Sequence, residues 1–247
     1  MIHYHGLPMW PSNAMLRAMK SHHACVSYAN PEQVEAAAEI CQSIFLDNGI
    51  FAAWSKGLQY DFAGYRDWVG FWIRHPAVDW CVIPDLIDGT AAENDELLRA
   101  WDLPKAVSVA VYHMHEPPER LARLVREYPR VGVGSSGGYR DPGTADWWNR
   151  IAEIMPYACD KDGYPICKLH GFRQLDPVIF SHIPYSSADS CTTAVSIGID
   201  KRWVGPYMPA SKEVRAIILM DRIESHASAR RWCADSAGVQ QNMELLG

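Results

Sequence analysis

Short apolar stretches alternate with longer stretches of helical periodicity along most of the chain. The short stretches, such as "SIFLD" at 43–47 and "VSVAVYH" at 107–113, are rich in β-branched and aromatic residues and predict β-strands. We expect eight strands, at 2–5, 24–28, 43–47, 80–85, 107–113, 130–135, 166–170 and 185–190. We expect helices between them at 31–42, 65–75, 91–101, 117–128 and 144–155, and a final helix at 211–232.

This alternation predicts parallel βα units, and eight is the number of strands that closes a (β/α)8 TIM barrel. An open, doubly wound sheet is the competing arrangement. The chain has 247 residues, 48% of them apolar, which is enough for one sizeable core. We therefore expect a single domain over residues 1–247, in which residues 201–247 form a C-terminal helical extension.

Charge and cysteine usage narrow the class of protein. The net charge of −6 does not mark the chain as a nucleic-acid binder. Charge is uneven along the chain. The stretch 201–231 carries seven cations against Glu213, Asp221 and Glu224, namely Lys201, Arg202, Lys212, Arg215, Arg222, Arg230 and Arg231. This stretch could contact phosphates, or it could be a solvated helix face. The chain has seven cysteines but no C-x-x-C, no apolar run long enough for a membrane and no signal-peptide pattern, so we expect a cytoplasmic protein.

Polar residues stand where most of the predicted strands end. In a TIM barrel these ends form the active site. The residues concerned are His5, Asn30, Asp47, Asn48, Asp85, His113, His115, Gly134, Ser135, His170 and Asp189. Three of them are aspartates on different strands, and we expect Asp47, Asp85 and Asp189 to meet in one pocket.

Several carboxylates around one pocket favour chemistry at a sugar carbon. One carboxylate can attack the anomeric carbon, and another can pass a proton to the leaving group. A third can accept hydrogen bonds from a donor-rich edge such as N1–H and N2–H₂ of guanine. The alternative for Asp47 is a role in the Asn48–Gly49 turn, and for Asp85 and Asp189 the capping of a following helix.

Five segments resemble the guanine transglycosylases, the superfamily of the queuine tRNA-ribosyltransferases. In chain order they are "FLDNGIF" (45–51), "VIPDLID" (82–88), "VGVGSSG" (131–137), "KLHGF" (168–172) and "YSSADSC" (185–191). The segments "VYHMHEPPERL", "VGVGSSGGY", "KLHGFRQLDP" and "HIPYSSADS" are similar to the short, phage-type branch, the DpdA-like 7-deazaguanine DNA transglycosylases. The similarity covers nearly all of residues 24–200.

This resemblance implies that guanine in DNA is exchanged for a free 7-deazaguanine base of the preQ0 or preQ1 type, a modification that shields phage DNA from restriction. It implies that Asp189 is the nucleophile, that Asp47 is the acid and base, and that Asp85 reads the base. The other implied binding residues are Asn48, Phe51 (stacking), His113 or His115 (the O6 side), Gly134, Ser135 and His170. No cofactor is expected, and the target nucleotide must be flipped out or single-stranded.

The chain departs from the family in two places. The C-x-C-x-x-C and His zinc site is missing, since only Cys233 and His226 stand in that region, and no metal is expected. Ala52 and Ile50 replace the Gln and the second Gly of the family's D-S-G-G-F-Q segment. Base exchange on tRNA remains an alternative substrate choice, and the sequence leaves a homodimer open.

A metal-dependent barrel hydrolase is the rival interpretation. Imidazole and carboxylate side chains at strand ends can hold Zn²⁺ or a two-metal centre. The candidate ligands are His3, His5, His113 or His115, His170 and Asp189. The loop Gly134–Gly137 could also hold a phosphate through its backbone N–H groups instead of contacting a base.

Overall fold

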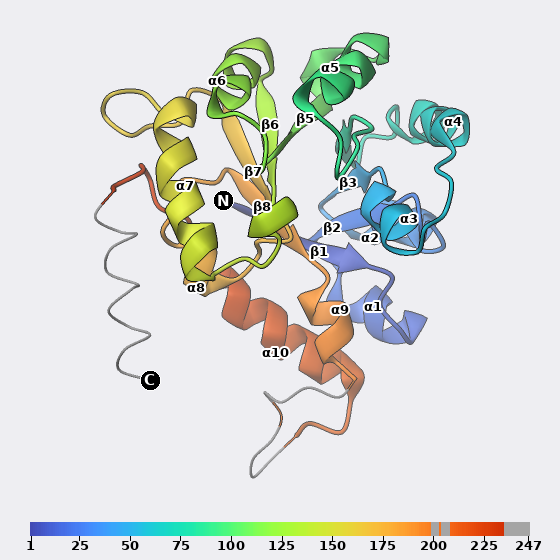
Figure 1. The fold of residues 1–247 in the computed structure, drawn as a ribbon. Helices are drawn as coiled ribbons and strands as arrows, with labels where there is room; N and C mark the ends of the chain where they lie inside the picture. The colour runs from blue at the N-terminus through green and yellow to red at the C-terminus, as the bar shows by residue number, and fades with distance from the viewer. Residues whose placement is uncertain (199–202, 204–207, 235–247) are drawn as a thin grey trace.

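Eight parallel strands close a barrel in chain order in the computed structural model, which describes residues 1–198, 203 and 208–234 (Figure 1). The strands are β1 (Ile2–Leu7), β2 (His23–Ser27), β3 (Ser43–Asp47), β4 (Val78–Val82), β5 (Ser108–His113), β6 (Arg130–Gly134), β7 (Lys168–Phe172) and β8 (Ser187–Ser190). The barrel closes where β1 pairs with β8, with Tyr4 opposite Asp189. The prediction of a (β/α)8 TIM barrel is confirmed.

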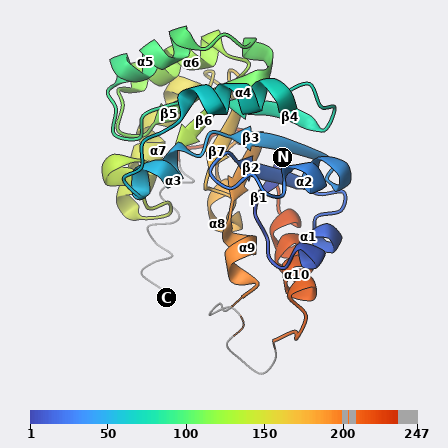
Figure 2. The same ribbon diagram turned by 90° about the vertical axis from the view of Figure 1, so that its right-hand side faces the viewer.

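Helices surround the barrel and lie between successive strands (Figures 1 and 2). They are α1 (Ser12–Ala18), α2 (Val34–Ile40), α3 (Ile50–Ser55), α4 (Phe62–Trp72), α5 (Ala91–Ala100), α6 (Pro118–Glu127), α7 (Ala145–Ala158), α8 (Pro177–Phe180), α9 (Thr192–Ser196) and α10 (Lys212–Glu224). Two short 3₁₀ helices, η1 (Lys105–Val107) and η2 (Gly137–Tyr139), complete the described elements. None of the described helices is both long and apolar enough to cross a membrane.

Helix α10 covers the seam between the last strand and the first. It packs against α1 and α9, next to β1. The expected helix 211–232 was too long, because α10 ends at Glu224. The side chains of Ser225 and His226 take the carbonyl of Arg222 as their hydrogen-bond acceptor, which ends the helix. Residues 199–202, 204–207 and 235–247 of the expected extension lie outside the described residues.

Large side chains fill the barrel interior below its mouth. Tyr4, Phe45 and Trp80 point inward, and the rings of Phe45 and Trp80 stack with centroids 4.0 Å apart. The Tyr4 hydroxyl donates to Asp79 at 2.5 Å. Because side chains alternate along a strand, the inward position of Tyr4 turns its neighbours on β1 toward the helices. The interior is therefore a packed core, and open space remains only toward the mouth.

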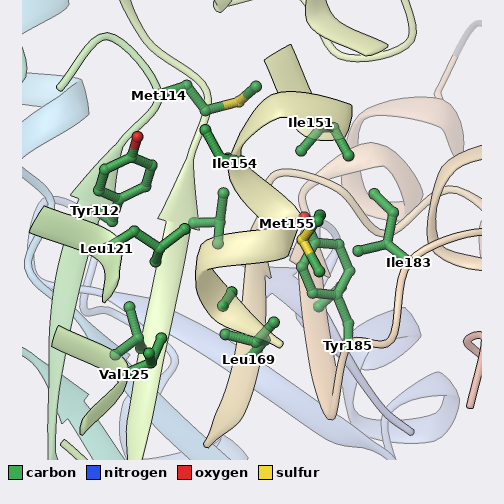
Figure 3. Close-up of a cluster of buried hydrophobic side chains, with 14 of the residues drawn as sticks. Tyr112, Met114, Leu121, Val125, Ile151, Ile154, Met155, Leu169, Ile183 and Tyr185 are labelled. Carbon is green, nitrogen blue, oxygen red and sulfur yellow. The ribbon is translucent and has the colours of Figure 1, made fainter. Parts of the chain in front are cut away.

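The main outer core lies between α7 and the strands beneath it. Ile151, Ile154 and Met155 follow helical spacing on one face of α7, and all three are fully buried (Figure 3). They pack in one cluster with Leu169 of β7 and Tyr112 of β5. Burial of each such side chain stabilises the fold by roughly 1.5–3 kcal/mol. This cluster holds β5 to β8 in place, and these strands carry half of the pocket described next.

Candidate active site

A cavity of about 670 Å³ opens at the carboxyl ends of the strands. Asp47 at the end of β3, Asp85 after β4 and Asp189 on β8 all line it, so the three aspartates meet in one pocket as the strand-end pattern predicts. Six further predicted residues also line the cavity: Asn30, Asn48, Phe51, His113, Gly134 and Ser135.

Asp189 is held through one of its two carboxylate oxygens. Oδ1 lies 3.2 Å from His170 Nε2 and accepts the backbone N–H of Arg173 at 3.0 Å. Among the described residues, no hydrogen bond occupies Oδ2. The carboxylate is 94% buried, with an exposed fraction of only 6%. It does not cap α9, whose N-cap is Cys191 and which has no side-chain cap. Two partners on Oδ1 fix the orientation of the group and leave Oδ2 accessible to a ligand in the cavity.

A buried chain of hydrogen bonds sets the tautomer of His170. Ser187 Oγ accepts from Arg130 Nη1 at 3.0 Å and lies 2.9 Å from His170 Nδ1. Because arginine can only donate, the Ser187 proton is available to Nδ1. The ionised Asp189 can only accept, so the proton of the imidazole sits on Nε2. Burial lowers the pKa of His170, which keeps the ring neutral in this arrangement.

Asp47 lies in a tight turn that helps to shape the pocket. Its Oδ2 accepts the Gly49 N–H at 3.0 Å, so the predicted turn contact is present. Gly49 has φ of 75°, and a Cβ there would lie 2.6 Å from the Ala29 nitrogen. Burial, together with the nearby Asp189 charge, raises the pKa of Asp47 to about 6, although hydrogen bonds from Ser27 and Gly49 act in the opposite direction. This carboxyl group can therefore hold a proton near neutral pH.

Asp85 has one partner on each of its oxygens. Asn48 Nδ2 donates to Oδ1 at 2.6 Å, and His113 Nε2 lies 2.7 Å from Oδ2. Helix α5 is capped by Thr90, so Asp85 does not serve as a helix cap. Each carboxylate oxygen can accept a second hydrogen bond, and Asp85 lines the cavity, so the group can still receive donors from a ligand. His113 Nδ1 is buried and has no hydrogen-bond partner among the described residues.

Phe51 lies at the rim of the cavity and does not belong to the core. Its exposed fraction is 42%, and it lines the cavity from the first turn of α3. The guanidinium of Arg173 lies over its ring, 4.4 Å from the centroid. Phe51 is thus an aromatic surface that a planar ligand can reach.

Three residues expected at the pocket do not line it. His170 is fully buried behind Asp189 and holds this carboxylate instead of contacting a ligand. His115 is exposed outside the cavity, where Nδ1 lies 2.8 Å from Ser136 Oγ and Nε2 lies 3.1 Å from the Gly89 carbonyl. His5 points away from the barrel axis toward Glu224 of α10, at 2.9 Å.

The ligand set of the rival hydrolase is not brought together. His3 and His5 face the outer layer, where His3 Nε2 lies 3.0 Å from the His226 carbonyl, while His113 and Asp189 line the cavity. Throughout the part of the chain that the structure describes, no group of three His, Cys, Asp or Glu side chains is arranged to hold a metal ion.

The end of β6 and the loop after it read G-x-G-x-x-G from Gly132 to Gly137, a spacing that also occurs in dinucleotide-binding turns. Here Gly132 lies inside the barrel, where a Cβ would clash with the Phe172 ring at 2.0 Å. The loop is followed by the three-residue helix η2, which offers no helix N-terminus of useful length. Gly134 and Ser135 line the cavity, and Ser135 Oγ accepts from Trp147 Nε1 at 2.9 Å.

Sequence reasoning missed Arg173, which lines the cavity and holds Asp189. The cause is the position of β7, which was expected to end at residue 170 but ends at Phe172. The signal was present, because Arg173 follows directly after "KLHGF" at a strand end. Cys25, Ser27 and Cys191 also line the cavity without having been predicted.

The basic stretch 201–231 does not form one face near the cavity. Arg215 is buried and donates to the carbonyls of Pro209, Ile197, Gly198 and Ala210. Arg230 lies in a groove at the opposite end of the barrel, next to residues that precede or begin β6, β7 and β8. Lys201 and Arg202 lie outside the described residues. The guanidinium of Arg215 is therefore engaged by backbone carbonyls, and Arg230 lies away from the cavity.

The chain matches no protein-family model and no curated protein.

Proposed function

We propose that this protein is a base-exchange transglycosylase that replaces guanine in DNA with a 7-deazaguanine through a covalent aspartyl-sugar intermediate. The observation that carries the proposal is the meeting of Asp47, Asp85 and Asp189 in one cavity. The Oδ2 of Asp189 has no hydrogen-bond partner among the described residues and can attack a sugar carbon. The pKa of Asp47, raised to about 6, suits proton transfer. The motif resemblance assigns the same roles to the same residues.

In the first displacement, Asp189 Oδ2 attacks C1′ of the target nucleotide. An O–C1′ bond forms, and the C1′–N9 bond breaks. Its electron pair leaves with guanine, which takes the proton of Asp47 and departs neutral. His170 and the Arg173 N–H keep the carboxylate aligned for this attack.

In the second displacement, the incoming base gives its N9 proton to Asp47 and attacks C1′, which releases Asp189. The acid–base cycle is supported by the electrostatics of the pair. Once Asp189 is an ester it has lost its charge, and one of the causes that raise the pKa of Asp47 is gone. The pKa of Asp47 is therefore lower in the covalent intermediate, and it rises again once Asp189 has been released from the sugar. Two displacements retain the configuration at C1′.

Base recognition is assigned to Asp85 with Asn48 and His113 beside it. The Asp85 carboxylate accepts from N1–H and N2–H₂ of guanine or a 7-deazaguanine, and Phe51 stacks on the base. Asn48 and His113 fix the carboxylate before the base enters. A cavity of about 670 Å³ falls within the size range of small-ligand sites, and a nucleotide must leave the helix to reach it.

The reaction needs DNA and a free base as partners, and no redox or group-carrying cofactor enters the balance. We expect it to take place in the cytoplasm. Cys25, Cys41 and Cys81 are buried thiols without disulfides, as is usual in a reducing compartment.

The deciding experiment incubates the protein with guanine-labelled DNA and, separately, guanine-labelled tRNA, each with a candidate 7-deazaguanine. We expect label release from DNA, and an Asp189→Asn variant that releases none and traps no DNA covalently. Asp141→Asn, in an exposed loop, is the matched control and keeps full activity. Release of label from tRNA alone would mean that the substrate is tRNA and not DNA. Near-normal release by Asp189→Asn would overturn the mechanism.

A further inference from the structure

The cavity is lined by three aspartates, yet the proposed substrate carries a phosphate on each side of the target nucleotide. Phosphates and carboxylates repel each other, so a cation near the mouth is needed. Arg173 is the only lysine or arginine among the described residues that line the cavity. Its side chain is exposed, and it forms no ion pair with any described residue.

Two features hold Arg173 in a defined geometry. The Cζ of its guanidinium lies over the Phe51 ring, 4.4 Å from the ring centroid, which is a cation–π contact at the rim. Its backbone has φ of 60°, a left-handed conformation that costs a residue with a side chain about 1 kcal/mol or more. In this conformation the N–H of Arg173 reaches Asp189 Oδ1 at 3.0 Å.

We propose that Arg173 is the phosphate-binding residue of this cavity and that it holds a phosphate flanking the target nucleotide. This inference rests on the proposed function and adds the contact that fixes the sugar. A guanidinium offers a fork of N–H donors that matches two phosphate oxygens, and the ring of Phe51 orients it. The same residue holds the nucleophile through its backbone, so it ties the position of the phosphate to that of Asp189.

The competing role for Arg173 is a general one, in which its charge only offsets the three aspartates. The two roles predict different effects on ligands. If Arg173 acts only through its general charge, its loss weakens binding of the 5′-monophosphate and of the 3′-monophosphate to a similar degree. If Arg173 contacts one phosphate, its loss weakens mainly the monophosphate that carries this phosphate. The variant must keep the contact between the Arg173 N–H and Asp189, because loss of this contact would change the affinities for the nucleoside and for the monophosphates alike.

Arg173→Gly meets this requirement. Glycine adopts a φ of 60° without strain and keeps the N–H that binds Asp189, so only the guanidinium is removed. Arg173→Lys keeps the charge but not the fork. Arg140→Ala is the matched control, since Arg140 is an exposed arginine in the loop after β6 whose one ion pair among the described residues is with Asp141.

The experiment measures affinities for deoxyguanosine, its 5′-monophosphate and its 3′-monophosphate by calorimetry, and the salt dependence of binding to a short single-stranded oligodeoxynucleotide. We expect the wild type to prefer one monophosphate over the nucleoside by roughly tenfold or more, Arg173→Gly to lose this preference, and Arg173→Lys to keep part of it. The slope of log K against log salt should fall by about 0.7 in Arg173→Gly and stay unchanged in Arg140→Ala.

A preference that survives in Arg173→Gly, or an equal loss of affinity for the two monophosphates, would overturn the proposal. Its failure is separate from that of the base exchange. A protein that prefers the monophosphate through Arg173 but releases guanine from no polymer keeps the phosphate site and loses the proposed reaction. A protein that exchanges guanine while Arg173→Gly binds like the wild type loses only the phosphate site.

Discussion

His170 donates its Nε2 proton to Asp189 Oδ1 across 3.2 Å, from a ring that is fully buried behind the carboxylate. The ring can do so because Ser187, itself held by Arg130, occupies Nδ1. The nucleophile of the proposed reaction is thus oriented from below by a chain that starts near the opposite end of the barrel, where Arg130 begins β6.

Removal of the Ser187 hydroxyl should slow the reaction without weakening substrate binding. In Ser187→Ala the Nδ1 side of His170 loses its partner, and only the contact with Asp189 still favours the Nε2 tautomer, so Asp189 is misaligned for part of the time. We expect kcat to fall by roughly tenfold and KM to change less than about twofold. Nitrogen NMR of His170 should show the proton on Nε2 in the wild type and a mixture in the variant.

Ser186→Ala is the control, because Ser186 Oγ donates only to the Leu169 carbonyl, away from the chain. Equal losses in the two serine variants would mean that β8 is merely destabilised. A wild-type His170 with its proton on Nδ1 would contradict the assigned hydrogen-bond direction directly.

The release of guanine should depend on pH through Asp47. Its pKa is raised to about 6, and the protonated form is the one that acts first. In a single turnover without incoming base, we expect the rate to fall about tenfold per pH unit above pH 6. Asp47→Asn should be slow and should lack this limb. Carbon NMR should place the carboxyl titration near pH 6 and move it lower in Asp189→Asn, because the repelling charge is gone. An Asp47 pKa that is the same in the wild type and in Asp189→Asn would refute the coupling between the two carboxyl groups.

Glu224 should make the stability of the fold depend on pH in two ranges, at acid pH and above neutral pH. His5 and His22 both bind it, at 2.9 Å, and these bonds lower its pKa to about 2 despite its partial burial. A lowered carboxyl pKa stabilises the fold above the unfolded value near 4.5, and this stability is lost as pH falls toward 2. The contact with Glu224 raises the pKa of His22, so its contribution is present below about 6.5 and is lost as pH rises through the raised value.

We therefore expect Glu224→Gln to lower the free energy of unfolding by about 2 kcal/mol near pH 6 and to flatten its dependence on pH between 5 and 2. Glu213→Gln is the control on the same helix, because Glu213 pairs only with the exposed Arg17 and should cost less than about 1 kcal/mol. Urea unfolding at several pH values measures both. A pH profile of Glu224→Gln parallel to that of the wild type would show that the three side chains are not coupled.

The limits of sequence reasoning follow from how a strand end is located. The barrel and the convergence of Asp47, Asp85 and Asp189 were predictable, because apolar strands stand out and parallel strands end at one face. A shift of two residues in the end of β7 was enough to hide Arg173, and the alternation along β1 turned His5 outward. The sequence pattern also could not show that Arg215 is buried, since a helical arginine looks the same whether it meets solvent or backbone carbonyls.

The C-terminal arginines should divide into one structural residue and three that do not affect substrate binding. The guanidinium of Arg215 donates to four carbonyls, two just before α10 and two just after α9, so Arg215→Ala should cost about 3 kcal/mol of stability by leaving them unpaired. Arg222, Arg230 and Arg231 are exposed, and Arg230 lies at the strand-start end, far from the cavity mouth. A triple change of these three to Gln should leave oligonucleotide affinity and its salt slope unchanged, while Arg173→Gly reduces the slope. A fall of about two units in the triple variant would mean that the DNA path runs along α10 and around the barrel, and that the cavity mouth receives only the end of it.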